Sequence, residues 1–257
     1  MRILIVNVNT TVSMTAGIGE QASRVAAPGT EIVALTPRFG AESVEGNLES
    51  YLAAVAVMDR VLAYDKPYDA VIQAGYGEHG REGLQELLDV PVVDITEAAA
   101  STAMYLGHRY SVVTTLDRAV PLIEDRLLLA GLDRRCASVR SSGMAVLELE
   151  SEPVRAVEAI VREAEAAVRE DHAEVICLGC GGMAELGTLV RERTRRTRGG
   201  WRRCGRHRRR VARPPGSVHV EGANVRATPG EEDDGVADHS LSAVRQGEEA
   251  ARVRDAG

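Results

Sequence analysis

Short apolar runs rich in β-branched residues alternate along most of this chain with longer segments whose apolar residues recur at helical spacing. The runs do not alternate apolar with polar residues, which is typical of strands buried on both faces of a parallel sheet. This alternation restricts the fold to an α/β architecture with parallel sheets flanked by helices. We expect strands at Arg2–Val6, Glu31–Leu35, Ala70–Gln73, Pro91–Asp94, Tyr110–Thr114, Ala137–Arg140 and Glu174–Leu178.

Three of the intervening segments carry a clear helical pattern. Between Val44 and Tyr64 the apolar residues fall at the spacing of an amphipathic helix, at Leu48, Leu52, Val55, Met58, Val61 and Leu62. Pro121–Ala130 and Pro153–Val168 follow the same pattern, and Ser151 with Pro153 is a helix start signal. Thr11 and Ser13 suit the cap of a helix that follows the first strand.

Composition and charge exclude several classes of protein. The formal net charge is −7 over 257 residues, which argues against a nucleic-acid partner. No apolar stretch is long enough to cross a membrane, and the apolar run that opens the chain is too short for a signal sequence. The 4 cysteines lack the spacing of a disulfide scaffold, so we expect a cytoplasmic protein.

Polar or glycine-rich residues follow four of the expected strands. These strand ends are Asn9–Thr11, Gly75–Gly80, Thr114–Thr115 and Gly179–Gly182. Ligands of open α/β sheets bind beyond the carboxyl ends of the strands. The pattern therefore predicts a site for a small molecule.

Cys180 carries the strongest single motif, a thiol between a strand and a glycine-rich helix start. Backbone N–H groups at such a helix start stabilise a thiolate, and they also bind a carboxylate or a developing enolate. A buried structural cysteine is the alternative interpretation, and we assign it to Cys177, which lies inside the apolar run. The Cys-x-x-Cys spacing has no second cysteine pair or histidine pair beside it, so it does not favour a metal site.

The order of the motifs VNVNTT, AGYGEHG, DVPVVDITEAAA, YSVVTT and VICLGCGGM resembles that of the Asp/Glu/hydantoin racemase superfamily, in particular hydantoin racemases, over residues 1–194. The resemblance implies two similar α/β lobes, residues 1–95 and 96–194, with the site between them. It implies chemistry without a cofactor or a metal, in which one cysteine removes a proton and a cysteine on the other lobe returns one. It also implies assembly into homo-oligomers.

The chain departs from this pattern at one catalytic position. Cys180 matches the second-lobe cysteine, but the first-lobe cysteine would fall at Gly75. A two-base racemase needs a group on each face of the planar intermediate, so His79 and Glu78 become the candidates for the second acid/base. The resemblance assigns substrate binding to Asn9, Thr10, Gly75, Tyr76, Thr114, Thr115, Gly181 and Gly182.

The leading hypothesis is racemisation of 5-monosubstituted hydantoins or related amino-acid derivatives, by thiolate-mediated proton abstraction at the acidic carbon and reprotonation. The missing thiol also fits a single-cysteine decarboxylase of the arylmalonate type, or another isomerase of the superfamily. A small-molecule-binding protein without catalysis is the third reading. Loss of optical rotation, release of carbon dioxide, or binding alone distinguishes the three.

Residues 195–257 change character, with arginines crowded together and then a Pro/Gly/Glu/Asp-rich stretch. The composition predicts disorder. Back-translation suggests another origin, because with suitable codons Arg195–Trp201 shifted by one base reads Gly-Val-Pro-Val-Val-Asp-Gly. That peptide echoes Asp89–Ile95, so we hypothesise a frameshift near Arg195, which would remove the closing strand and final helix of the family.

Overall fold

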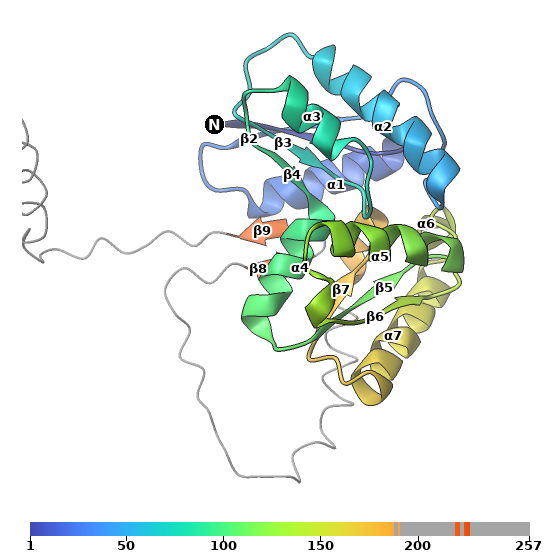
Figure 1. Ribbon diagram of the computed structural model, residues 1–257. Helices are drawn as coiled ribbons and strands as arrows, with labels where there is room; N and C mark the ends of the chain where they lie inside the picture. The colour runs from blue at the N-terminus through green and yellow to red at the C-terminus, as the bar shows by residue number, and fades with distance from the viewer. Residues whose placement is uncertain (188–189, 191–218, 222–223, 227–257) are drawn as a thin grey trace, which may run out of the picture.

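The computed structural model describes residues 1–187, 190, 219–221 and 224–226, and it has two parallel sheets flanked by helices (Figure 1). The first sheet has the order β2-β1-β3-β4 and the second has the order β6-β5-β7. The expected α/β fold is therefore confirmed. The strands of the two sheets are β1 Arg2–Val6, β2 Glu31–Leu35, β3 Ala70–Gln73, β4 Val92–Asp94, β5 Tyr110–Thr114, β6 Cys136–Ser141 and β7 Val175–Leu178.

The helices lie between the strands in the expected places. Thr11 stands at the N-cap of α1, but its side chain makes no capping hydrogen bond, whereas Asp94 caps α4 by accepting a bond from the Glu97 backbone N–H at 2.8 Å. The α-helices are α1 Val12–Val25, α2 Asn47–Leu62, α3 Arg81–Leu87, α4 Ile95–Leu106, α5 Val120–Leu129, α6 Glu148–Ser151 and α7 Pro153–Glu170. Short 3₁₀ helices span Asp117–Ala119 (η1), Asp133–Arg135 (η2) and Gly181–Leu186 (η3).

The apolar stripe that predicted α2 is not the face by which this helix packs. Most of the stripe is exposed, Leu48 by 70%. The buried face carries small side chains instead, notably Ala53, Ala56 and Val57. Small residues let a helix approach its sheet closely, so they can form the inner face although their pattern is weak in the sequence.

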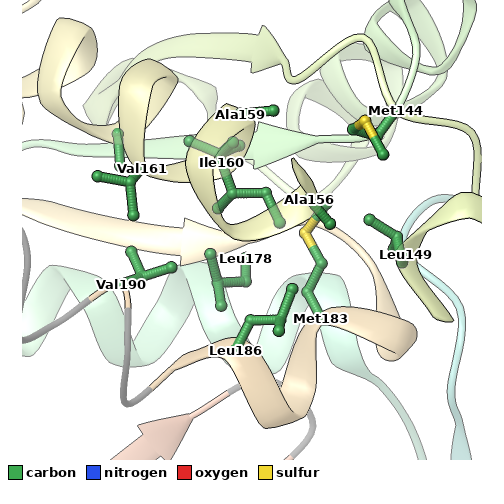
Figure 2. Packing of buried hydrophobic residues seen from close by; sticks show 12 residues of the cluster. Met144, Leu149, Ala156, Ala159, Ile160, Val161, Leu178, Met183, Leu186 and Val190 are labelled. Carbon is green, nitrogen blue, oxygen red and sulfur yellow. The ribbon is translucent and has the colours of Figure 1, made fainter. Parts of the chain in front are cut away.

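The core of the second lobe supports the end of β7. Figure 2 shows Leu178 of β7 and Met183 of η3 near Ala156 and Ile160 of α7, and all four side chains are buried. Cys180 lies between Leu178 and Met183 in the chain and packs against this core and against a second cluster, formed by residues of β1 and α1 with Ala74 and Val146. The position of Cys180 is therefore fixed from both lobes.

The remaining described residues belong to the segment for which composition predicted disorder. His219–Glu221 (β8) and Asn224–Arg226 (β9) form a short antiparallel pair, which the sequence pattern did not predict. The rest of that prediction lies outside the described residues. No helix in the described part of the chain combines the length and the apolar character needed to span a membrane.

Candidate functional site

A pocket lies where the carboxyl ends of β1 and β3 in the first sheet meet those of β5 and β7 in the second. Its polar lining residues are Asn7, Asn9, Glu45, His79, Thr114, Thr115 and Cys180. Its apolar lining includes Val8, Met14, Val44, Tyr76, Ala119, Leu122 and Val146, and Gly75 and Gly181 complete the strand ends. Most of the residues expected at the site therefore lie together, while Thr10, Glu78 and Gly182 do not line the pocket.

Cys180 follows β7 directly and stands at the N-cap of η3. Its side chain is partly exposed and lines the pocket. Burial raises the pKa of the Cys180 thiol to about 11, although the backbone N–H groups of Gly182 and Met183 act in the opposite direction. The residue is therefore a thiol at neutral pH, and the N–H groups can stabilise a thiolate once one forms.

His79 reaches the pocket from the loop between β3 and α3. The ring is 2% exposed, and its Nδ1 lies 2.9 Å from the hydroxyl of Ser50 on α2. Burial lowers the pKa of His79 to about 4, so the imidazole is neutral at neutral pH. The absence of a side chain at Gly75 makes room for this ring, because a Cβ there would lie 2.4 Å from His79 Cδ2.

Glu78, the other candidate for the second acid/base, serves the start of α3 instead. Its Oε1 accepts hydrogen bonds from the backbone N–H groups of Gly80 at 2.6 Å and Arg81 at 3.1 Å. Burial raises the pKa of Glu78 to about 7, with a hydrogen bond to Glu82 as the next cause. The carboxylate also lies 3.5 Å from Arg126, whose buried guanidinium joins α5 to the first lobe.

The asparagines that follow β1 form a buried unit. Asn7 donates to Asn9 Oδ1 at 2.8 Å and to Thr15 at 2.9 Å, and its own oxygen accepts from the Val8 backbone N–H at 2.8 Å. Among the described residues, the only acceptor near the Nδ2 group of Asn9 is the weak acceptor Met14 Sδ, at 3.2 Å. Asn9 therefore keeps N–H donor capacity for a ligand, and Asn7, which was not among the expected site residues, holds it in place.

Thr114 at the end of β5 and Thr115 after it differ in whether the hydroxyl is free to bond a ligand. The Thr114 hydroxyl donates to the Gly179 carbonyl at 3.1 Å and so ties β5 to β7. The Thr115 hydroxyl has no hydrogen-bond partner among the described residues, and the residue lines the pocket. Thr115 is therefore the better ligand donor of the two.

Two other expected ligand contacts have structural partners. Thr10 bonds the Ala41 carbonyl through its backbone N–H at 3.0 Å and its hydroxyl at 3.3 Å. Tyr76 packs in the same buried cluster as Cys177, so its ring forms part of the pocket wall.

Glu45 is a site residue that the sequence reasoning missed. It accepts from the Val146 backbone N–H at 2.9 Å and from the Arg118 guanidinium at 2.7 Å, and so joins the loop before α2 to two segments of the second lobe. Burial acts to raise the pKa of Glu45, but the hydrogen bonds from Arg118 and Val146 together hold it below its ordinary value. The pocket is thus bordered by one carboxylate, and no lysine or arginine occurs among its described lining residues.

Cys177 does not share the site with Cys180. Its side chain is 6% exposed within the core of the second lobe, next to the Ala99 carbonyl. Burial raises its pKa to about 12. No group of three or more His, Cys, Asp or Glu side chains in the described part of the chain could hold a metal ion.

Comparison with known proteins identifies the family. The family model "Asp/Glu/Hydantoin racemase" matches residues 3–197. A hydantoin racemase of Pseudomonas sp. (strain NS671) is 38% identical over 187 residues, which cover 72% of this chain and 75% of that protein. The crystal structure of an allantoin racemase from Pseudomonas fluorescens is 80% identical, with a TM-score of 0.75 over 76% of this chain and 83% of that one.

A more distant structure shares the fold alone. A variant of arylmalonate decarboxylase superposes with a TM-score of 0.54 at 19% identity, over 75% of this chain and 84% of that one. The matches in sequence and in structure agree with each other and with the two parallel sheets described above. This chain belongs to the Asp/Glu/hydantoin racemase family and is a racemase, that is, an isomerase.

Proposed function

We propose that the chain racemises hydantoins substituted at C5, without a cofactor, by removing the C5 proton on one face of the ring and returning a proton on the other. The C5–H bond is acidified by the adjacent carbonyl, so an enolate can form without an electron sink. Allantoin, a hydantoin with a ureido group at C5, is the first substrate to test, because the 80% identical protein is described as an allantoin racemase.

The observation that carries this proposal is that Cys180 and His79 line one pocket from different lobes. Cys180 follows β7 of the second sheet, and His79 follows β3 of the first sheet. Racemisation needs two groups that exchange a proton on opposite faces of a planar intermediate. A pair held by two lobes around one pocket meets this need without a thiol at position 75.

The protonation states of the pair are complementary. With its pKa raised to about 11, Cys180 carries a proton at neutral pH, and with its pKa lowered to about 4, His79 carries none on its second nitrogen. His79 therefore takes the C5 proton of one enantiomer, and the Cys180 thiol protonates the opposite face. In the reverse direction the Cys180 thiolate, stabilised by the N–H groups of Gly182 and Met183, removes the proton and the His79 imidazolium returns it.

The electrostatics of the pocket support a neutral substrate. Glu45 contributes a carboxylate, and the described lining residues include no lysine or arginine. A hydantoin ring is uncharged, whereas an arylmalonate carries two carboxylates that Glu45 would repel. The Asn9 amide and the Thr115 hydroxyl supply polar contacts for the carbonyl and N–H groups of the ring.

The test is incubation of single enantiomers of allantoin and of a panel of 5-substituted hydantoins in heavy water. We expect optical rotation to fall faster than in buffer alone, with deuterium at C5 of the product and protium retained in the unreacted enantiomer. Exchange in the unreacted enantiomer would indicate one base acting on both faces. Carbon dioxide release from an arylmalonate without racemisation would favour a decarboxylase, and binding without turnover would favour a binding protein.

A further inference from the structure

Ser50 makes two hydrogen bonds at the loop that carries His79, one with the His79 ring and one with the backbone of Glu78. It stands in the first turn of α2 and is 2% exposed. Its hydroxyl donates to the backbone carbonyl of Glu78, the residue before His79, and its Oγ lies 2.9 Å from His79 Nδ1. One buried hydroxyl therefore holds both the backbone and the ring at this point of the loop.

Counting protons fixes the direction of the second bond. A serine hydroxyl has one proton, and the Glu78 carbonyl can only accept, so that proton is committed to the carbonyl. The hydroxyl must then accept from His79 Nδ1, which places the ring proton on Nδ1. The ring also donates a hydrogen bond to the backbone carbonyl of Tyr76, so we infer that the same Nδ1–H group serves both acceptors. The buried, neutral imidazole has one ring proton, and Nε2 is then left unprotonated.

The unprotonated edge of the ring faces the two glycines of the loop. A Cβ on Gly75 would lie 2.4 Å from His79 Cδ2, and a Cβ on Gly77 would lie 3.3 Å from His79 Nε2. Gly75 lines the pocket, as does His79 itself. A Cβ on Gly77 would also lie 2.0 Å from Leu122 Cδ2, so the Nε2 edge of the ring lies near Leu122, which lines the pocket as His79 does.

We propose that Ser50 is a positioning residue that holds His79 as the Nδ1–H tautomer, so that Nε2 is the atom that accepts the proton of the substrate. The inference rests on the proposed function for the role of His79, but not for its tautomer. In the other tautomer Nε2 would carry a proton and could only donate. The serine thus determines whether the ring can act as a base.

Nitrogen-15 NMR of the histidine rings tests the tautomer without reference to activity. The full chain is labelled at histidine, and the His79 signals are assigned by their loss in His79→Asn. We expect a protonated Nδ1 and an unprotonated Nε2 in the unsubstituted protein, and a population of the Nε2–H tautomer in Ser50→Ala. A protonated Nε2 in the unsubstituted protein would overturn the inference; His79→Asn serves only to assign the signals.

Kinetics provide the second readout. We expect Ser50→Ala to lower kcat by about 10- to 100-fold with little change in KM, a part of the 10²–10⁴-fold that a general base contributes. Ser50→Thr retains a hydroxyl and should recover most of this loss. The matched control is Ser111→Ala, which removes an equally buried hydroxyl that bonds Ser138 in the second lobe, and it should leave kcat unchanged.

The outcomes separate the two proposals. If Ser50→Ala changes neither the His79 tautomer nor kcat in an active protein, Ser50 does not position His79. A protein with the expected tautomer but no racemase activity contradicts the proposed function and leaves the assignment of the tautomer standing.

Discussion

The imidazole of His79 occupies the space that a side chain at Gly75 would need. A Cβ on Gly75 would lie 2.4 Å from both His79 Cδ2 and Val8 Cγ1 and 2.7 Å from Gln73 Nε2, all closer than real Cβ contacts. Position 75 is where the resemblance places the first-lobe cysteine, so a thiol there and the ring of His79 compete for one volume. Under the proposed function, the ring and a thiol at position 75 are alternative ways to supply the first-lobe acid/base.

This competition predicts the behaviour of a double variant. Gly75→Cys alone should overpack the site, lower stability by about 1–3 kcal/mol and reduce racemisation. His79→Ala alone should remove the base and reduce racemisation by about 10²–10⁴-fold. In the double variant the contact with the ring is lost, while those with Val8 Cγ1 and Gln73 Nε2 remain, so the thiol should restore only part of the racemisation lost in His79→Ala, as measured by loss of optical rotation of allantoin.

Additive effects of the two substitutions on racemisation would contradict the idea that the thiol can replace the ring. If the double variant is as inactive as the two single changes together imply, then the thiol and the ring do not substitute for each other. Urea unfolding of all three variants controls for stability, because the double variant should be more stable than Gly75→Cys if the clash with the ring is the cause.

Cys180→Ser tests the second-lobe acid/base. A hydroxyl is a far weaker acid than a thiol, so we expect kcat to fall by at least about 100-fold while the affinity for the substrate changes little. Calorimetric titration with allantoin measures the affinity, and polarimetry measures turnover. Cys177→Ser changes a core thiol of the same chain and should lower stability rather than abolish turnover.

The buried neutral state of His79 predicts a pH-dependent loss of stability. Its pKa falls from 6.5 to about 4 on folding, so between these values the unfolded chain binds more protons than the folded chain. Above pH 6.5 the buried ring causes no loss of stability. As the pH falls from 6.5 toward 4, the free energy of unfolding decreases, by about 3 kcal/mol at the acid end of the window. Urea unfolding of the unsubstituted protein and of His79→Gln across this window measures the difference.

The control for this experiment is His108→Gln, which removes an exposed histidine. The stability of this variant should follow that of the unsubstituted protein throughout the window. A parallel pH dependence for His79→Gln would show that the His79 ring is not buried in its neutral form.

The strands were predictable from the sequence because buried parallel strands are continuous apolar runs with polar ends. All seven expected strands occur. Two of them, β4 and β7, begin one residue later than expected, at Val92 and Val175, and β6 is one residue longer at each end, as Cys136–Ser141. Cys180 was predictable for the same reason, since its glycine context follows such a run directly. The packing face of α2 was not predictable from the sequence. Its buried residues Ala53 and Ala56 give a weaker hydrophobic signal than the exposed Leu48 and Leu52.

The supporting residues of the site could not be predicted because they come from segments without a motif. Glu45 lies in a loop before α2, and its partners are 73 and 101 residues away in the chain. Ser50 looks like an ordinary residue of a helical segment. Thr115 is a better ligand donor than Thr114 because the Thr114 hydroxyl is hydrogen-bonded to the Gly179 carbonyl, and no local sequence pattern reveals that bond.

Glu45 is predicted to tune the acidity of Cys180. Its carboxylate is among the causes that raise the pKa of Cys180, so Glu45→Gln should lower that pKa and increase the thiolate fraction, about tenfold for each unit. Alkylation of Cys180 by iodoacetamide, followed by mass spectrometry, measures the fraction. Glu49→Gln also removes a contact with Arg118, at 3.4 Å, but not from the pocket lining, so it should leave the alkylation rate unchanged.

The two sheets are alike in order except at one edge. In the first sheet β2, β1 and β3 are followed by β4, whereas among the described residues the second sheet ends after its counterparts β6, β5 and β7. The peptide that Arg195–Trp201 can encode one base out of frame resembles Asp89–Ile95, the segment that supplies β4. The match to the family model ends at residue 197. A frameshift near Arg195 would therefore replace the strand that should follow β7.

Sequencing the locus and restoring the frame tests this explanation. We expect codons for Arg195–Trp201 that spell the strand when read one base later, followed by a stretch rich in alanine and valine. A gene with one base removed just before codon 195 should then encode a protein that has that strand after β7. Its Tm should exceed that of the present chain by about 5–10 °C, since each kcal/mol is worth roughly 2–4 °C in a domain of this size. Codons that cannot spell the strand, or a Tm that does not rise, would show that residues 195–257 are the native continuation.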